Sequence, residues 1–192
     1  MPARPDEFLF PASDIPASVK AALGDDLELR PLAISDHARG HFELLTVLTA
    51  APNIGKDAYI DRFEYLRSCP NTYYTVVIVH KATDQLVAVG TVFVERKFTR
   101  SGGLVAHIED IAVSKKMQGR KLGLLIIKTL EELGRQAGCY KVILDCSKEN
   151  IAFYEKCGRV SWNLEFKHKE YEMVMYLDSP PALAAATPAP RL

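Results

Sequence analysis

Residues 118–123 read QGRKLG and stand directly before a long amphipathic segment. The first turn of a helix has unpaired N–H groups and the positive end of the helix dipole. Glycine permits close approach of the backbone, so this turn could cradle a phosphate or diphosphate, while Arg120 and Lys121 would add positive charge. The pattern matches neither the Walker sequence nor GxGxxG. By itself it fits a simple glycine-rich turn equally well.

Three carboxylates and a phenol offer groups for proton transfer. Glu109 and Asp110 are neighbours in a predicted strand, so they should point to opposite faces; alone, the pair also fits a solvated edge. Asp145 lies in the apolar segment ILDC, where a carboxylate has a raised pKa or a partner; the alternative is a structural carboxylate bound to backbone N–H groups. Tyr154 could donate a proton, because a phenol has a pKa of about 10. It could equally belong to the core, where we place its neighbour Phe153.

The composition narrows the classes of function. Lys plus Arg equals Asp plus Glu at 24 each, so no global charge indicates nucleic acid or an acidic membrane. No apolar run reaches the ~20 residues of a membrane span, and the N-terminus lacks the apolar stretch of a secretory signal. The four cysteines form no CxxC pair, which favours reduced thiols in the cytoplasm over a disulfide or metal site.

The elements that must position these groups lie between two proline-containing ends. Residues 1–24 are predicted to be an extension that packs locally without adding chemistry, residues 25–178 a single domain, and residues 179–192 a disordered Pro/Ala-rich tail. Apolar periodicity and turn residues predict strands at 27–32, 73–81, 86–97, 107–113 and 139–146, with one or two more within 162–177. Helices are predicted from Ser35 and Asp36 to Thr49 and over 56–68, 119–137 and 148–158. The order β-α-α-β-β-β-α-β-α-β-β predicts an α/β (α+β) fold, with a mixed central sheet flanked by helices.

These motifs together resemble the GNAT superfamily of acetyl-CoA-dependent N-acetyltransferases. The helix-opening motif of that family is Q/R-x-x-G-x-G/A; Gln118 and Gly123 match its ends, and Lys121 replaces the inner glycine. The segments ERKFTR (95–100), HIEDIAV (107–113), YKVILDC (140–146) and NIAFYEKCG (150–158) resemble the eukaryotic glucosamine 6-phosphate N-acetyltransferase subfamily, in which the inner glycine is often replaced. The resemblance covers residues 27–177 and implies a GNAT fold.

The resemblance implies acetyl-CoA as co-substrate and no metal. The diphosphate would bind at the turn 118–123, the pantetheine amides along strand 107–113, and the sulfur beside Tyr154. From the residues alone, the strand could be an ordinary ladder, Asn150 a helix cap and Lys156 plain surface. The implied coenzyme contacts are Ile111, Ala112, Val113, Gln118, Gly119, Arg120, Lys121, Leu122, Gly123, Asn150, Tyr154, Glu155 and Lys156.

It also implies D-glucosamine 6-phosphate as the acceptor. The amine would attack the thioester directly, without an acyl-enzyme, because no cysteine has an activating sequence context. Glu109 and Asp145 would receive the proton of the amine, and Tyr154 would protonate the departing thiolate. Lys97 and Arg100 would bind the phosphate, although ERKFTR alone fits a basic surface loop. The implied substrate contacts are Thr49, Lys97, Phe98, Thr99, Arg100, Glu109, Asp110, Ile111 and Asp145.

The last apolar segment, EYEMVMYL, should prefer a partner over solvent. The resemblance implies a homodimer with exchanged C-terminal strands, in which Tyr176 stands where the subfamily usually has a phosphate-binding Arg. Two other functions remain open: a GNAT enzyme that acetylates another small amine or a protein amine, and a non-catalytic acyl-CoA-binding module.

Overall fold

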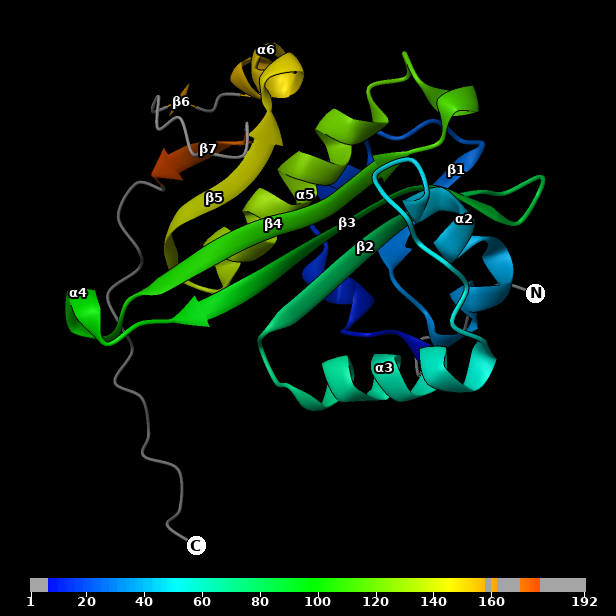
Figure 1. The fold of residues 1–192 in the computed structure, drawn as a ribbon, viewed down its shortest axis with the longest axis horizontal. Helices are drawn as coiled ribbons and strands as arrows, with labels where there is room; N and C mark the ends of the chain where they lie inside the picture. Colours follow the sequence, from blue (N-terminus) through cyan, green and yellow to red (C-terminus); the bar gives the residue numbers. More distant parts are fainter. Residues whose placement is uncertain (1–6, 158–159, 162–169, 177–192) are drawn as a thin grey trace, which may run out of the picture.

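The computed structural model describes residues 7–157, 160–161 and 170–176. Within them the chain forms one seven-stranded sheet in the order β1-β2-β3-β4-β5-β7-β6 (Figure 1). The strands are β1 (Leu27–Pro31), β2 (Tyr73–His80), β3 (Gln85–Arg96), β4 (Leu104–Val113), β5 (Cys139–Ser147), β6 (Val160–Ser161) and β7 (Glu170–Tyr176). The helices are α1 (Ala17–Lys20), α2 (His41–Leu45), α3 (Lys56–Ser68), α4 (Thr99–Gly102), α5 (Leu122–Gln136) and α6 (Ile151–Lys156). Short 3-10 turns cover Ala12–Asp14, Ile34–Arg39, Lys115–Met117 and Lys148–Asn150.

The sheet is mixed. Strands β1 to β4 pair antiparallel in chain order, β4 and β5 pair parallel, and β7 pairs antiparallel with β5 and β6. A parallel pair requires a crossover connection, and α5 supplies it. The predicted fold class and element order are therefore confirmed, with α1 and α4 as short additions.

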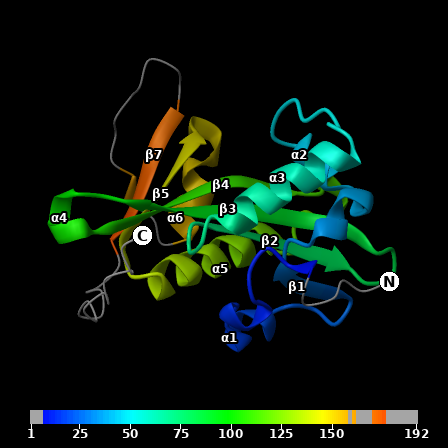
Figure 2. The same cartoon turned by 90° about the horizontal axis from the view of Figure 1, so that it is seen from below.

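Helices cover both faces of this sheet, with α2 and α3 on one side and α1 and α5 on the other (Figure 2). The apolar face predicted for α5 is buried against the sheet, and Gly138 ends the helix at φ 82°. Close contact is possible because Gly90 of β3 has no side chain: a Cβ there would lie 2.5 Å from Ile126 Cγ2. Helix α3 has the predicted bounds and stops before Pro70.

The segment before β1 packs more deeply than a local extension. Leu9, Phe10 and Ile15 belong to the same hydrophobic core as the sheet, and Phe8 forms a β-bridge with Ala33. The domain limits 25–178 remain a prediction. The predicted tail, 179–192, lies outside the described residues.

Two helix boundaries differ from the sequence prediction. Helix α2 ends at Leu45 instead of near Thr49, and turn hydrogen bonds follow it; Gly40, at φ 81°, separates it from the preceding 3-10 turn. The predicted cap residue Asp36 does not open a helix to solvent. It is fully buried and accepts two hydrogen bonds of 2.7 Å from the Arg30 guanidinium. The same carboxylate accepts a 2.8 Å hydrogen bond from the Ala33 N–H, so Asp36 caps the 3-10 turn Ile34–Arg39 from within the core.

Candidate active site

The candidate site is a gap between β4 and β5, which separate toward α6 (Figure 1). Their parallel pairing runs from Leu104 with Cys139 to His107 with Ile143, while β4 continues to Val113 on β3 and β5 continues to Ser147 on β7. A cavity of about 480 Å³ lies where the strands separate. It is lined by Leu48, Ile108, Glu109, Asp110, Ile111, Leu144, Asp145, Cys146, Ser147, Asn150 and Tyr154.

A β-bulge places Glu109 and Asp110 at this cavity. Glu109 pairs with Thr91 and Ala112 with Val89, and the register shifts between these pairs. Asp110 sits in the shift at φ 54°, a left-handed conformation that Asp tolerates better than most residues. The expectation that the two carboxylates face opposite sides of a regular strand was wrong, because the bulge breaks the alternation. Both residues are exposed and line the same cavity.

Asp145 brings a third carboxylate from β5. Its neighbours Leu144 and Cys146 are buried, while Asp145 itself is exposed at the cavity. The separation of β4 from β5 opens this face of the strand. None of the described residues that line the cavity is a Lys or Arg. The cavity is therefore acidic, although the whole chain has no net charge.

Tyr154 and Asn150 close the cavity from the side of α6. Tyr154 is partly buried and packs against the core. Asn150 is the N-cap residue of α6, but its side chain makes no capping hydrogen bond within the described residues and instead donates to Ser147 Oγ at 3.3 Å. The core position expected for Phe153 was wrong: its side chain is 39% exposed, edge-on to Tyr154 at 5.1 Å. Glu155 and Lys156 are exposed on α6 outside the cavity lining.

The turn 118–123 adjoins the gap. Gly119 has φ 83° and Lys121 φ 59°, so α5 begins at Leu122 rather than at the expected 119. The N-cap residue Lys121 has no acceptor atom in its side chain and cannot cap the first N–H groups of α5, so an anion could bind them. A Cβ on Gly123 would lie 3.3 Å from Phe153 Cζ and 3.6 Å from Val113 Cγ2, so the turn, the end of β4 and α6 meet here.

The other predicted coenzyme contacts divide by exposure. Gln118, Gly119, Arg120 and Lys121 are exposed, whereas Leu122 and Ala112 are buried and could offer only backbone groups. Arg120 is not a mobile charge: its guanidinium forms two 2.8 Å hydrogen bonds with the Asp26 carboxylate.

The predicted phosphate-binding loop is not brought to this cavity. Lys97, Phe98, Thr99 and Arg100 lie at α4, the far end of the β3–β4 hairpin (Figure 1). Glu109 lies five positions beyond Leu104 along β4, or ~17 Å of strand. The Lys97 ammonium lies 2.7 Å from a Glu95 carboxylate oxygen, and the Arg100 guanidinium lies over the ring of Tyr140, 4.8 Å from its centroid. Thr49 is exposed and follows Leu48, but it is not among the residues that line the cavity.

Sequence reasoning missed several lining residues. Cys146 and Ser147 follow Asp145 on β5, and Leu48 arrives from the loop after α2. Cys146 and Ser147 can be recognised as lining residues only from the separation of β4 and β5 in the structure. Leu48 lies in the largely apolar segment TVLTAAPNIG (46–55), so its residue type gave no distinct signal; in the structure it is 45% exposed.

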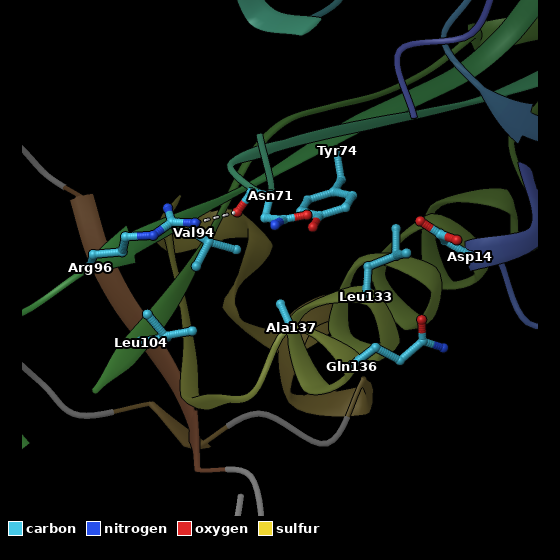
Figure 3. Close-up of a pocket in the computed structure, with 9 residues that line it drawn as sticks. All are labelled: Asp14, Asn71, Tyr74, Val94, Arg96, Leu104, Leu133, Gln136 and Ala137. Atoms are coloured by element: carbon cyan, nitrogen blue, oxygen red, sulfur yellow. Dashed lines mark hydrogen bonds between the residues drawn. The ribbon is translucent and has the colours of Figure 1, made fainter. Parts of the chain in front are cut away.

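Cavity size alone does not select the site. A cavity of about 450 Å³ lies beside the C-terminal end of α5. Figure 3 shows Arg96 and Asn71 at one end of it and Asp14 and Gln136 at the other, with a 3.2 Å hydrogen bond from Arg96 to the Asn71 carbonyl. None of the predicted site residues lines it.

Comparison with known proteins agrees with this geometry. Residues 42–158 match the acetyltransferase (GNAT) family. The chain belongs to the GNAT acetyltransferase family. The resemblance, and the fold class that it implied, are confirmed.

Relatives within the GNAT family are similar over most of the chain. Glucosamine 6-phosphate N-acetyltransferase 1 of Dictyostelium discoideum is 41% identical over 165 residues, which are 86% of this chain and all of the relative. Glucosamine 6-phosphate N-acetyltransferase of Candida albicans is 43% identical, over 67% of this chain and 86% of the relative. The crystal structure of glucosamine-6-phosphate N-acetyltransferase from Arabidopsis thaliana has a TM-score of 0.71 at 38% identity, covering 73% of this chain and 95% of that one.

Proposed function

We propose that this GNAT enzyme transfers the acetyl group of acetyl-CoA to the amine of D-glucosamine 6-phosphate. The products would be N-acetyl-D-glucosamine 6-phosphate and coenzyme A, a step toward UDP-N-acetylglucosamine. The observation that carries the proposal is the gap between β4 and β5, where three carboxylates and the Tyr154 phenol line one cavity next to the turn 118–123. The relatives that bear this enzyme name support the choice of acceptor.

The coenzyme would lie along the gap. Its diphosphate would bind the amides that begin α5, at Gln118–Gly123, where two left-handed residues turn the backbone. Its pantetheine amides would pair with the edge of β4 at Ile111–Val113, beyond the last pairing with β5 at His107. Asn150, Glu155 and Lys156 of the α6 region would complete the contacts.

The chain's own residues would move two protons. The amine, with a pKa of ~8, is mostly protonated at pH 7 and must lose a proton to attack. Glu109 or Asp145 would accept that proton, directly or through water, because both carboxylates line the cavity. As the nitrogen–carbon bond forms and the carbon–sulfur bond breaks, the Tyr154 hydroxyl would donate its proton to the thiolate.

The phosphate of the acceptor requires cations that the described cavity lining lacks. We propose that a second copy supplies them in a homodimer, through the loop Lys97–Arg100 with Phe98 and Thr99. Phe98 is fully exposed at this loop, which supports a contact with another chain. In the structure β7 pairs with β5 of its own chain, so an exchanged C-terminal strand would replace this pairing with the same one from a partner.

The acidic cavity also favours a second candidate, a GNAT enzyme for another, cationic amine. Three carboxylates without a lining cation would attract a polyamine or a basic peptide more readily than a phosphosugar. Arg100→Ala separates the two functions, because it should raise the KM for glucosamine 6-phosphate and leave the KM for a cationic amine unchanged.

Thiol release from acetyl-CoA tests the proposal. We expect rapid release with glucosamine 6-phosphate, at least ~100-fold less with glucosamine at the same concentration, and sequential kinetics. Preference for a polyamine would establish the second candidate. No release with any amine would indicate a non-catalytic coenzyme-binding module, and ping-pong kinetics with a trapped acetylated cysteine would contradict direct attack.

The compartment is a further proposal. All four cysteines lie within the described residues and have free thiols, which supports the reducing cytoplasm. No helix in the described part of the chain is long and apolar enough to cross a membrane.

A further inference from the structure

An ion pair joins the start of β1 to the turn before α5. Asp26 Oδ2 accepts a hydrogen bond from Arg120 Nη1, and Asp26 Oδ1 accepts one from Nη2, both at 2.8 Å. This parallel two-bond geometry is the strongest form of an arginine–carboxylate contact. It connects residues 94 positions apart in the sequence.

The Asp26 end of the pair is held by the sheet. The Lys81 N–H donates to the Asp26 carbonyl at 2.9 Å, and Lys81 Nζ donates to the Asp25 carbonyl at 2.8 Å. The next residue, Leu27, is buried and pairs with His80 in β2. Hydrogen bonds from Arg120 lower the pKa of Asp26 below its ordinary value.

The Arg120 end lies in a backbone that needs support. Arg120 stands between Gly119 and Lys121, both with positive φ, and a left-handed conformation at Lys121 persists only where its surroundings impose it. Arg120 Nη1 also lies 3.5 Å from Met117 Sδ, on the other side of Gly119. The guanidinium is thus directed toward β1 and Met117.

We propose that Asp26 is a positioning residue for coenzyme binding. Through Arg120 it holds the turn 118–123 in the conformation that presents the first amides of α5 to the diphosphate. Arg120 then connects the turn to the start of β1 and does not bind the phosphate directly. The segment before β1 thereby positions the coenzyme-binding turn. This inference rests on the proposed function, because it assumes that coenzyme A binds at this turn.

The test compares Asp26→Asn, Arg120→Gln and the double variant by calorimetric titration with coenzyme A. Each single change should raise the Kd, because it releases the turn from β1. The rise should be only ~3- to 10-fold, because both side chains are partly exposed and solvent weakens the ion pair. The double variant should bind no more weakly than Arg120→Gln, because one interaction is lost in every case. The kcat at saturating acetyl-CoA should stay within twofold, while the KM for acetyl-CoA rises.

Asp25→Asn is the matched control, since it removes the same charge one residue away and keeps the contact of Lys81 with its carbonyl. Its Kd should equal that of the wild type. Tighter binding by Asp26→Asn together with weaker binding by Arg120→Gln would overturn the proposal, because Arg120 would then be a phosphate ligand for which Asp26 competes. Unchanged Kd values in all variants would also overturn it.

Hydrogen exchange on the coenzyme-free chain separates this inference from the proposed function. Asp26→Asn should speed exchange of the amides at 119–123, and Asp25→Asn should not. If Asp26→Asn and the wild type exchange these amides at equal rates, Asp26 does not hold the turn, even if coenzyme A binds. A wild-type chain that does not bind coenzyme A would overturn both the proposed function and the positioning role.

Discussion

Three different backbone conformations place the carboxylates of Glu109, Asp110 and Asp145 at the cavity between β4 and β5. Glu109 follows the regular part of β4, Asp110 sits in the bulge at φ 54°, and Asp145 faces outward from β5. Three negative charges around one cavity repel each other and attract a protonated amine. The same charges stabilise the protonated form of the amine, so one of these carboxylates must lie within direct or water-mediated reach of the nitrogen to accept its proton.

Tyr154→Phe tests the proton donor. The change removes only the hydroxyl, so the ring packing of Tyr154 against the core is kept. We expect the kcat to fall ~100-fold, because general acids contribute 10²–10⁴-fold, while the KM for acetyl-CoA changes less than ~3-fold. The control is Tyr65→Phe on the exposed side of α3, which should leave both constants unchanged. Equal kcat values for Tyr154→Phe and wild type would exclude the acid role.

His41 should make stability depend on pH. It is largely buried, its Nδ1 has no hydrogen-bond partner among the described residues, and burial lowers its pKa from 6.5 to about 4. Asp36 and Glu43 oppose this shift and His37 adds to it. Because the unfolded chain binds the proton first, stability is complete above pH 6.5 and falls as the pH decreases toward 4, by up to about 3 kcal/mol.

Urea unfolding between pH 4.5 and 7.5, at fixed protein concentration, measures this effect. His41→Phe should flatten the rise in unfolding free energy between pH 4.5 and 6.5. Phe42→Leu removes a neighbouring ring without a titratable group, so it should lower stability equally at every pH. A slope that survives His41→Phe would assign the pH dependence to other groups.

At the scale of elements, Gly123 determines how closely α5 approaches α6. A methyl group at this position would lie 3.3 Å from Phe153 Cζ, closer than the ring tolerates without moving. Because Phe153 is partly exposed, it can move aside, so we expect Gly123→Ala to fold. The displaced ring should disturb the site proposed for the diphosphate and raise the KM for acetyl-CoA about fivefold, equivalent to ~1 kcal/mol.

A second substitution provides the check. Phe153→Leu removes the outer atoms of the ring, so Gly123→Ala in that background should have a KM within twofold of Phe153→Leu alone. Steady-state kinetics with varied acetyl-CoA measures all three variants. If Gly123→Ala binds acetyl-CoA as well as the wild type, the approach of α5 to α6 does not shape the coenzyme site.

Local sequence could predict elements whose ends are set by local signals. The bounds of α3 follow from its apolar spacing and Pro70, and the hairpin of β2 and β3 follows from two β-branched runs around a turn. The start of α5 could not be predicted in this way, because no local signal marks the left-handed conformation of Lys121, and the neighbouring Arg120 pairs with Asp26, 94 positions away in the sequence. The bulge at Asp110 is likewise set by pairing with β3.

The candidate site shows the same division. Residue types and motif order indicated Glu109, Asp145 and Tyr154, which the structure brings to one cavity. The exposure of Asp145 could not be read from its apolar neighbours, because it depends on the separation of β5 from β4 after His107. The distance of Lys97 and Arg100 from the cavity depends on the length of the β3–β4 hairpin, which a motif does not report.

For the whole molecule, the distribution of charge matters more than its sum. The chain has equal numbers of acidic and basic residues, yet the cavity lining carries three carboxylates, and the predicted phosphate-binding loop extends from the opposite end of the hairpin. Arg100 and Ser101 hold positive φ at this loop, at 52° and 55°, which presents Phe98 and the loop outward. A C2 dimer could place this loop of each copy at the acidic cavity of the other.

Subunit complementation tests that arrangement. Arg100→Ala and Tyr154→Phe would each impair every site of their own homodimer. In a heterodimer of the two, one site would combine Arg100 from one copy with Tyr154 from the other and would be intact. Co-expression at equal levels yields about half heterodimers, so we expect about a quarter of wild-type activity. Pairing Tyr154→Phe with Asp145→Asn is the control, because both residues line the same cavity and no intact site results. Activity that never exceeds the mean of the two parents would place Arg100 in the site of its own chain, and the hairpin would then have to fold back toward the cavity.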